Sequence, residues 1–178
     1  MSELITLKDK QFKPYILECD ILEEVKKMAN VINVELKNDL PLFLVVLNGA
    51  FMFASDLLKE ITIPCEVSFI KVASYDGVGS SGTVNELIGL NENLKGRTVV
   101  IVEDIIDTGL TINRIAEILY LKEVKQIKVA TALLKPDSYK KDLKINYVAH
   151  KIKNEFVVGY GLDYLGYGRN LKELYILA

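Results

Sequence analysis

The chain has 178 residues, of which 50% are hydrophobic and 26% charged, and its formal net charge is −2. This composition is typical of a globular protein with a sizeable core, and the acidic balance argues against a nucleic-acid-binding surface. Because the chain has one histidine and two well-separated cysteines, a zinc site is improbable, and Cys19 and Cys65 predict free thiols rather than a disulfide framework.

Hydrophobic periodicity and turn residues predict alternating helices and strands. In chain order, we expect a helix over 20–36, a strand over 42–47, a helix over 51–61, strands over 66–73 and 86–90, a strand beginning at 99, a helix over 111–121, and strands over 127–134, 145–150, 156–161 and 174–177. Asp20 can cap the first helix, with Glu23 as its capping-box partner. The order predicts an α/β protein with an open, mostly parallel twisted sheet flanked by helices.

Two loops of this predicted fold have a functional and a plain interpretation. Asn48-Gly49 ends a strand before a helix, where glycine lets backbone amides face an anion, although an ordinary turn is the simpler interpretation. Residues 74–83 hold three glycines and several serines, so they form either a lid that closes over a site or a passive hairpin.

The most informative stretch is 99–111. Four β-branched residues, Val99 to Val102, lead into Glu103-Asp104, two isoleucines and Asp107-Thr-Gly-Leu-Thr. This pattern predicts a strand buried on both faces, a tight polar loop and a helix. Open parallel sheets bind ligands at this position, beyond the carboxyl ends of their strands.

The loop that begins at Asp107 has the residues of a phosphate cradle, because backbone amides and two hydroxyls meet a helix N-terminus. It is neither a Walker A loop nor a dinucleotide fingerprint, since the required glycine spacing is missing. The carboxylates of Glu103 and Asp104 are suited to sugar hydroxyls or Mg²⁺, so a sugar-phosphate ligand is indicated. Asp107 is either a general base or an N-cap, and locally the cap is the simpler interpretation.

Two other classes of site fit the sequence less well. In a phosphoacceptor receiver domain, the acidic pair precedes a strand that ends in the acceptor aspartate, whereas the next strand here ends in Lys135. A Ser-His-Asp apparatus would need His150, which falls in a predicted strand and is expected to pack there.

The 99–111 stretch resembles the phosphoribosyl-pyrophosphate motif of the type I phosphoribosyltransferases. The chain from about 40 to 177 is similar to the hypoxanthine-guanine branch of that family, through Leu47-Asn48-Gly49-Ala50, Ser74-Tyr75, Lys135, the run from Phe156 to Tyr164, and Arg169. The resemblance implies one phosphoribosyltransferase domain over 1–178, with a small hood built from the N- and C-terminal segments.

The resemblance also implies a role for each matching residue. Asp107 is the proton acceptor near purine N7, and Glu103 and Asp104 hold the ribose hydroxyls. The 5′-phosphate is bound by Asp107, Thr108, Gly109, Leu110 and Thr111. The purine is bound by Lys135, Phe156, Val157 and Asp163, and pyrophosphate by Asn48, Gly49 and Arg169, with a cis peptide in the pyrophosphate turn. Ser74 and Tyr75 open the lid, and Mg²⁺ is held by Glu103, Asp104 and Asp163. Asn48 stands where a basic residue is frequent in the family, but its implied role mainly uses backbone amides, so the assignment to pyrophosphate stands.

The implied activity is transfer of the phosphoribosyl group from phosphoribosyl pyrophosphate to hypoxanthine or guanine, giving IMP or GMP and pyrophosphate. The family also implies a homodimer or homotetramer, with no nucleic-acid or membrane partner. A cytoplasmic location is expected, because residues 1–10 lack a signal-peptide pattern and no apolar run approaches the roughly 18 to 20 residues of a membrane span.

The side chain of Lys135 gives a physical reason for the choice of base. An ammonium group only donates hydrogen bonds, so Lys135 can bond a 6-oxo group but cannot satisfy the 6-amino group of adenine. A transferase for another base is therefore disfavoured. A ligand-sensing regulator built on the same fold is disfavoured too, because Asp107 is present and the chain is acidic.

Overall fold

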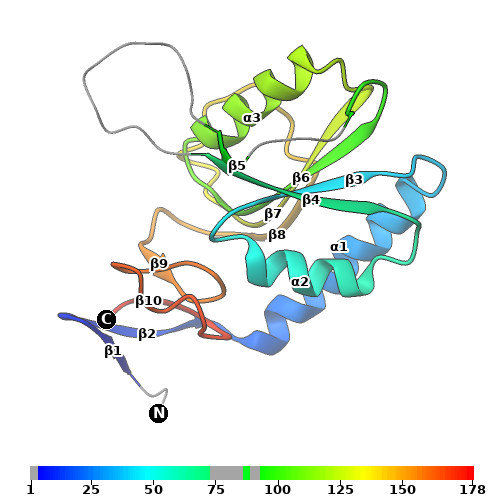
Figure 1. Cartoon of the computed structure of the whole chain (residues 1–178). Helices are drawn as coiled ribbons and strands as arrows, with labels where there is room; N and C mark the ends of the chain where they lie inside the picture. The colour runs from blue at the N-terminus through cyan, green and yellow to red at the C-terminus, as the bar shows by residue number, and fades with distance from the viewer. Residues whose placement is uncertain (1–3, 73–85, 89–92) are drawn as a thin grey trace, which may run out of the picture.

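The computed structural model describes residues 4–72, 86–88 and 93–178 and contains two sheets (Figure 1). The larger sheet has six strands in the order β5-β4-β3-β6-β7-β8, and the smaller has four in the order β1-β2-β10-β9. In the larger sheet every pairing is parallel except that of β4 with β5. The predicted architecture, a mostly parallel sheet with a hood from both ends of the chain, is confirmed.

The elements of the larger sheet and its helices agree with the predicted order, with ends that differ by a few residues. They are α1 (Glu18–Glu35), β3 (Leu42–Val46), α2 (Phe51–Glu60), β4 (Glu66–Val72), β5 (Glu86–Ile88), β6 (Thr98–Ile106), α3 (Leu110–Leu121), β7 (Gln126–Leu134) and β8 (Tyr147–Lys151). The smaller sheet consists of β1 (Ile5–Leu7), β2 (Lys10–Ile16), β9 (Val157–Val158) and β10 (Leu174–Leu177).

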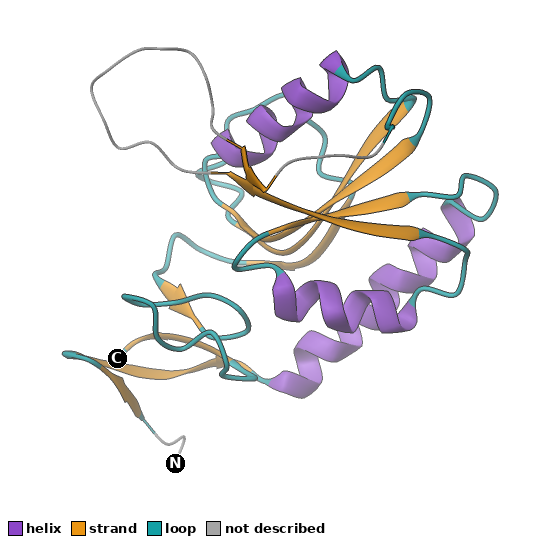
Figure 2. Ribbon diagram, viewed as in Figure 1, coloured by secondary structure: helices purple, strands orange, loops and turns teal. Residues whose placement is uncertain are grey.

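The central strand β6 is buried on both faces, as its run of β-branched residues predicts. Val100 and Val102 pack into a core with α1 and α2, whereas Val99 and Ile101 pack into a second core with α3. Figure 2 shows this layering, with α1 and α2 on one side of the sheet and α3 on the other. The alternation assigns successive side chains of β6 to opposite faces of the sheet, and the polar residues follow at its carboxyl end.

We call residues 4–17 and 156–178 the hood, because they form the smaller sheet and the loop between β9 and β10. In it, β2 and β9 both pair antiparallel with β10, and Phe12 of β2 is fully buried. The strand predicted over 156–161 is reduced to Val157–Val158, because positive φ angles begin at Gly159 and turn the chain away from the ladder. The hood thus closes one side of the carboxyl edge of the larger sheet (Figure 1).

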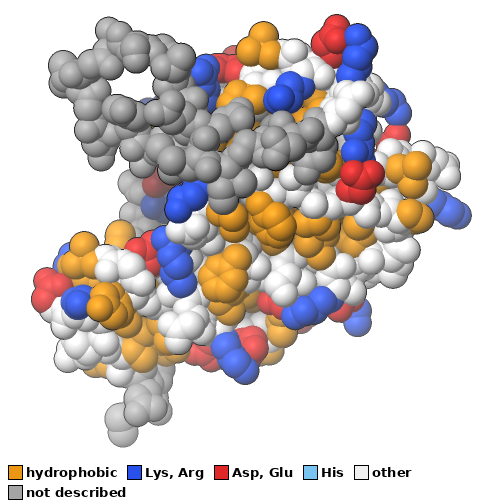
Figure 3. Space-filling view, viewed as in Figure 1, with side chains coloured by type: hydrophobic (Ala, Val, Ile, Leu, Met, Phe, Trp, Pro, Cys, Tyr) orange, Lys and Arg blue, Asp and Glu red, His pale blue; other side chains and the backbone are white. Residues whose placement is uncertain are grey.

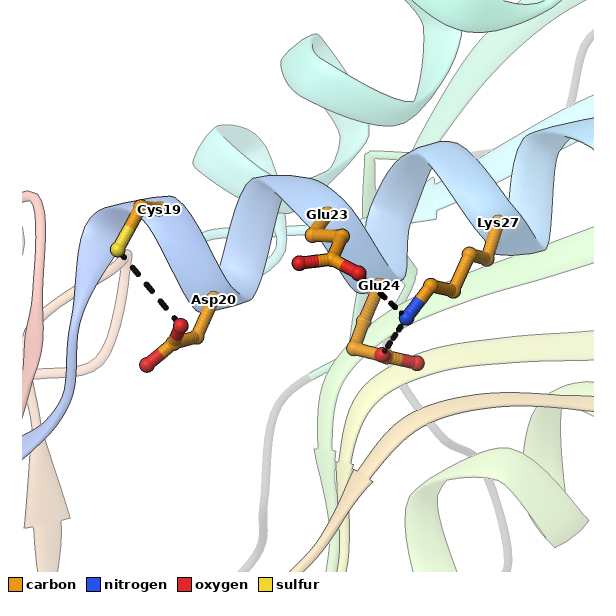
Figure 4. Close-up of polar contacts among 5 residues, drawn as sticks. All are labelled: Cys19, Asp20, Glu23, Glu24 and Lys27. Atoms are coloured by element: carbon orange, nitrogen blue, oxygen red, sulfur yellow. Dashed lines mark hydrogen bonds and ion pairs between the residues drawn. The ribbon is translucent and has the colours of Figure 1, made fainter.

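The predicted capping of the first helix is wrong. Helix α1 begins two residues earlier, its N-cap is Leu17, and no side chain caps it. Asp20 lies inside the first turn, where it accepts a bond from the Cys19 thiol, and Glu23 pairs with Lys27 instead (Figure 4). These pairs are exposed and contribute little to stability.

Two smaller expectations agree with the structure. Cys19 and Cys65 are free, exposed thiols, as predicted. His150 lies half-buried on β8, as expected for a histidine that packs on a strand. Within the described part of the chain, no helix combines the length and apolar character required to span a membrane.

Candidate active site

A cavity of about 780 Å³ lies between the carboxyl edge of the larger sheet and the hood. Its wall includes the acid pair Glu103-Asp104, Asp107, Lys135, Phe156 and Arg169. These residues come from the ends of β6 and β7 and from the hood, so segments more than 60 positions apart in sequence meet at one opening. An adjoining hollow of about 100 Å³ is enclosed by residues 103 and 105–112, the predicted phosphate loop among them.

In the acid pair at the end of β6, Glu103 is buried and Asp104 is half-buried, and both are hard to ionise. Glu103 is 5% exposed, and Asp104 packs beside it. Burial and the neighbouring carboxylate of Asp104 raise the pKa of Glu103 well above its ordinary value. Burial also raises the pKa of Asp104, against the opposing effect of the Arg169 guanidinium. Such a pair is suited to binding a cation, which offsets the repulsion between the two carboxylates, or hydroxyl groups, which donate hydrogen bonds to their oxygens.

The raised pKa of Glu103 predicts that the ligand-free protein loses stability as pH rises above 4.5, its ordinary value. The folded state favours the protonated form, so that contribution is lost as pH passes through the folded-state pKa. Glu103→Gln imitates the protonated form and should unfold less readily than wild type at pH 8. Urea unfolding in EDTA from pH 5 to 8 measures this gain, which should grow with pH. An equal pH dependence in both proteins would contradict the raised pKa, and the exposed Glu123→Gln serves as control.

The turn between β3 and α2 lies directly against the acid pair. Its Leu47–Asn48 peptide bond is cis, as the resemblance implies. A Cβ atom added to Gly49 would lie 1.6 Å from Oδ2 of Asp104, so only glycine permits this approach. Gly49 lines the cavity, and the predicted pyrophosphate turn and ribose carboxylates are therefore neighbours in space.

Asp107 does not cap helix α3. The N-cap position belongs to Gly109, whose φ is 80°, and no side chain bonds the first turn. The Asp107 carboxylate instead accepts a bond from Nζ of Lys135 at 2.9 Å. Of the two interpretations of Asp107, the cap is wrong, and the side chain lies in the cavity with a cation beside it.

Lys135 follows the last residue of β7, and its backbone amide donates to the carbonyl of Ile106. Its side chain is only 11% exposed, against 43% for the side chain of Asp107. A buried ammonium requires a partner, and among the described residues Asp107 supplies the ion pair. The pair therefore fixes a hydrogen-bond donor and an acceptor side by side in the cavity wall.

The hood supplies an aromatic side to the cavity. Phe156 is 46% exposed, and its ring packs at a near-right angle to that of Tyr164, with a centroid distance of 5.9 Å, and lies 6.4 Å from that of Phe12. Val157 is buried next to it, and β9 is held by pairing with β10. Nζ of Lys10 lies 6.0 Å from the centroid of the Phe156 ring. The exposed part of this supported ring can stack on a flat heterocycle.

Arg169 and Asp163 form an ion pair that the sequence analysis does not foresee. The guanidinium lies 2.5 Å from Oδ1 of Asp163 and donates to the carbonyl of Gly161 at 2.7 Å. The second oxygen of Asp163 accepts from the amide of Gly166. Both side chains line the cavity, but Asp163 is already engaged on both oxygens.

Sequence reasoning leaves Arg114 unassigned, although it also lines the cavity. Its guanidinium pairs with Glu117, and its Nε is buried without a hydrogen-bond partner among the described residues. The helical spacing of three residues from Thr111 is the signal that could have found it. By contrast, Ser74 and Tyr75 of the predicted lid lie outside the described residues.

Comparison with known proteins agrees with the family resemblance found in the sequence. A family model, phosphoribosyl transferase domain, matches residues 18–165. The hypoxanthine-guanine phosphoribosyltransferase of Bacillus subtilis (strain 168) is 39% identical over 166 residues, which cover 93% of this chain and 92% of the relative. The chain belongs to the hypoxanthine-guanine phosphoribosyltransferase family. The family member from Streptococcus pyogenes serotype M3 (strain MGAS315) is 37% identical over 161 residues, covering 90% of this chain and 89% of that protein.

Solved structures of the same family agree with the fold. A hypoxanthine phosphoribosyltransferase from Staphylococcus aureus (tetragonal crystals) superimposes with a TM-score of 0.87 at 35% identity, covering 93% of this chain and 91% of the other. A mutant hypoxanthine phosphoribosyltransferase from Trypanosoma cruzi, in a ternary substrates complex, gives 0.86 at 31% identity, with 97% coverage of both chains. The family predicted from the sequence is confirmed.

Proposed function

We propose that the protein transfers the 5-phosphoribosyl group of phosphoribosyl pyrophosphate to hypoxanthine or guanine, giving IMP or GMP and pyrophosphate, as a pentosyltransferase of purine salvage. The observation that carries the proposal is a single cavity that joins the Glu103-Asp104 acid pair, the Asp107–Lys135 ion pair, the exposed aromatic residue Phe156 and Arg169. Each group suits a different part of the two substrates.

The Asp107–Lys135 pair suits a 6-oxopurine. The ammonium carries three N–H donors, so Lys135 can bond the 6-oxo group while it still contacts Asp107. Asp107 is then beside the imidazole part of the purine, where it accepts the proton at N7 as N9 attacks C1′. Phe156 stacks on the base without regard to substituents, so it adds affinity while Lys135 gives the choice.

The acid pair suits the ribose. Departure of pyrophosphate leaves positive charge on the sugar, which the carboxylates of Glu103 and Asp104 stabilise while they accept bonds from its hydroxyls. The amides and hydroxyls of residues 107–111 hold the 5′-phosphate at the start of α3. Amides of the Asn48-Gly49 turn and the guanidinium of Arg169 hold the leaving pyrophosphate.

The donor set fits Mg²⁺ shared with substrate oxygens. In the described part of the chain, no group of three or more His, Cys, Asp or Glu residues forms a dedicated metal cage. Mg²⁺ usually takes one or two carboxylates together with substrate phosphates. Glu103 and Asp104 fit that role, and Asp163 would join them by sharing its bond to Arg169. When bound, the cation neutralises charge on the pyrophosphate.

The proposed assembly is a homodimer or homotetramer in the cytoplasm. Phe51 of α2 and Val67 and Phe69 of β4 are exposed apolar side chains, and hydrophobic groups gather over these elements (Figure 3). A surface of this kind is typical of contacts between subunits. Sedimentation velocity should give a mass of at least twice the monomer, and a monomer at micromolar concentration would contradict the assembly.

Pyrophosphate release from phosphoribosyl pyrophosphate and Mg²⁺ tests the function with each base in turn. We expect release with hypoxanthine or guanine and little with adenine, because adenine leaves the Lys135 donor unpaired. Xanthine tests the reading of the 2-position. No release with any base would contradict the proposed function.

A further inference from the structure

The hood is fastened to helix α2 by a hydrogen bond that no proposed substrate role uses. Tyr160 is 2% exposed, and its hydroxyl donates to Oδ2 of Asp56 at 3.0 Å. The backbone amide of Tyr160 donates to the carbonyl of Leu171, so the residue is held from two sides. Figure 1 shows the chain between β9 and β10 lying next to the start of α2.

The backbone around Tyr160 has an unusual conformation. Gly159, Tyr160 and Gly161 have successive φ angles of 94°, 48° and 99°, all in the left-handed region. A tyrosine adopts this region at an energetic cost, and such residues persist only where surrounding contacts determine them. The Asp56 bond is one of those contacts.

Gly161, the next residue, joins the hood to the pyrophosphate turn. A Cβ atom at Gly161 would lie 2.0 Å from the carbonyl oxygen of Gly49, so the two backbones touch. The carbonyl of Gly161 accepts from Nη1 of Arg169, and its amide donates to the Arg169 carbonyl. Gly161 thus lies between the two groups assigned to pyrophosphate, the turn at Gly49 and the guanidinium of Arg169.

The purine side of the cavity is fixed differently. Val157 and Val158 pair with Ile176 and Tyr175 of β10, so the base-binding wall is held by a ladder within the hood. Loosening Tyr160 should therefore disturb the pyrophosphate end more than the purine end.

We propose that Tyr160 and Asp56 are positioning residues, which hold Gly161 against Gly49 and so set the distance between the pyrophosphate turn and Arg169. The inference rests on the proposed function for its substrate, since it concerns the pyrophosphate end of that same cavity. Tyr160 is buried and does not line the cavity, yet its loss should weaken the binding of phosphoribosyl pyrophosphate and not that of the purine.

Tyr160→Phe removes the bond and keeps the ring. We expect the KM for phosphoribosyl pyrophosphate and the Kd of magnesium pyrophosphate to rise by about threefold to tenfold, the effect of losing one ordinary hydrogen bond, because the Tyr160 bond acts on pyrophosphate only through Gly161. The KM for hypoxanthine should stay within about twofold of wild type. Steady-state kinetics and isothermal titration calorimetry measure these values.

Tyr147→Phe is the matched control. Its hydroxyl also donates to a helix carboxylate, that of Glu35 at 2.6 Å, but it joins β8 to α1 and does not line the cavity. Both variants should lower the unfolding temperature, whereas only Tyr160→Phe should weaken pyrophosphate binding. Equal effects of the two variants on pyrophosphate would overturn the inference, as would an equal rise in both KM values for Tyr160→Phe.

Variants of Asp56 test the same bond from the other side. Asp56→Asn keeps an oxygen that accepts from Tyr160 and loses only an exposed pair with Lys59, so its pyrophosphate affinity should remain near that of wild type. Asp56→Ala should weaken pyrophosphate binding as much as Tyr160→Phe does. If Tyr160→Phe does not fold, Asp56→Ala provides the test of the Tyr160–Asp56 bond. A wild-type affinity in Asp56→Ala would overturn the inference. Calorimetry measures pyrophosphate binding without turnover, so its result does not depend on whether the proposed reaction occurs.

Discussion

Replacing Asp107 with alanine is expected to lower kcat by about 10²- to 10⁴-fold, the range for loss of a general acid or base. The carboxylate lies in the cavity beside Lys135 and does not cap α3, so its position is explained by the proton it would accept rather than by helix stability. Steady-state rates with hypoxanthine and saturating phosphoribosyl pyrophosphate measure the loss.

Asp107→Asn separates the chemical role from the structural one. Asparagine still offers an oxygen to Lys135, so the cavity wall is preserved, but it does not accept a proton at neutral pH. We expect this variant to be as slow as Asp107→Ala. Activity within threefold of wild type in either variant would contradict the assignment, and Asp137→Ala, an exposed aspartate after β7, should leave kcat within twofold.

Replacing Lys135 with alanine is expected to lower the preference for hypoxanthine over adenine by about 10²-fold or more, measured as the ratio of kcat/KM values. In the proposed function, adenine is excluded because its 6-amino group would meet a donor, and alanine would remove that conflict. The rate with hypoxanthine should also fall, since Asp107 loses its partner, so the ratio is the informative quantity.

Two further variants make this comparison specific. Lys135→Arg keeps only donors and should keep adenine excluded. Lys128→Ala removes another lysine of β7, which pairs with Glu35 away from the cavity, and should leave the ratio unchanged. Adenine excluded as strongly in Lys135→Ala as in wild type would mean that another group reads the 6-position.

Much of the larger sheet could be predicted because its signal is local. The β-branched run from Val99 to Val102 has few other stable placements than a strand buried on both faces. Parallel order then brings the polar residues after β6 and β7 to the same edge. Asp107 and Lys135, 28 positions apart, follow neighbouring strands in this way, and the family resemblance is what assigned both residues to the purine site.

The hood strands β1 and β2 could not be predicted by the same reasoning. Strand β2 contains Pro14, which argues against a strand, and Phe12 is its one fully buried residue. Its place is set by β10, at the other end of the chain. The bond from Tyr164 to Asp9 likewise spans 155 positions. No local pattern specifies contacts of this kind.

Inside the site, residue types were easier to predict than their pairing. Arg169 and Asp163 were expected to bind different parts of the substrates, yet they bind each other. The left-handed conformation of Gly109 likewise decides how α3 begins, although aspartate is the commoner cap. Such details depend on backbone angles and on neighbours from distant segments.

The most direct test is the stoichiometry of one reaction. Purified protein is mixed with hypoxanthine, phosphoribosyl pyrophosphate and Mg²⁺, and IMP is quantified by chromatography while pyrophosphate is measured by an enzyme-coupled assay. A phosphoribosyl transfer predicts equal amounts of IMP and pyrophosphate, formed at the same rate and only when both substrates are present. Absence of IMP, or pyrophosphate formed without IMP, would contradict it.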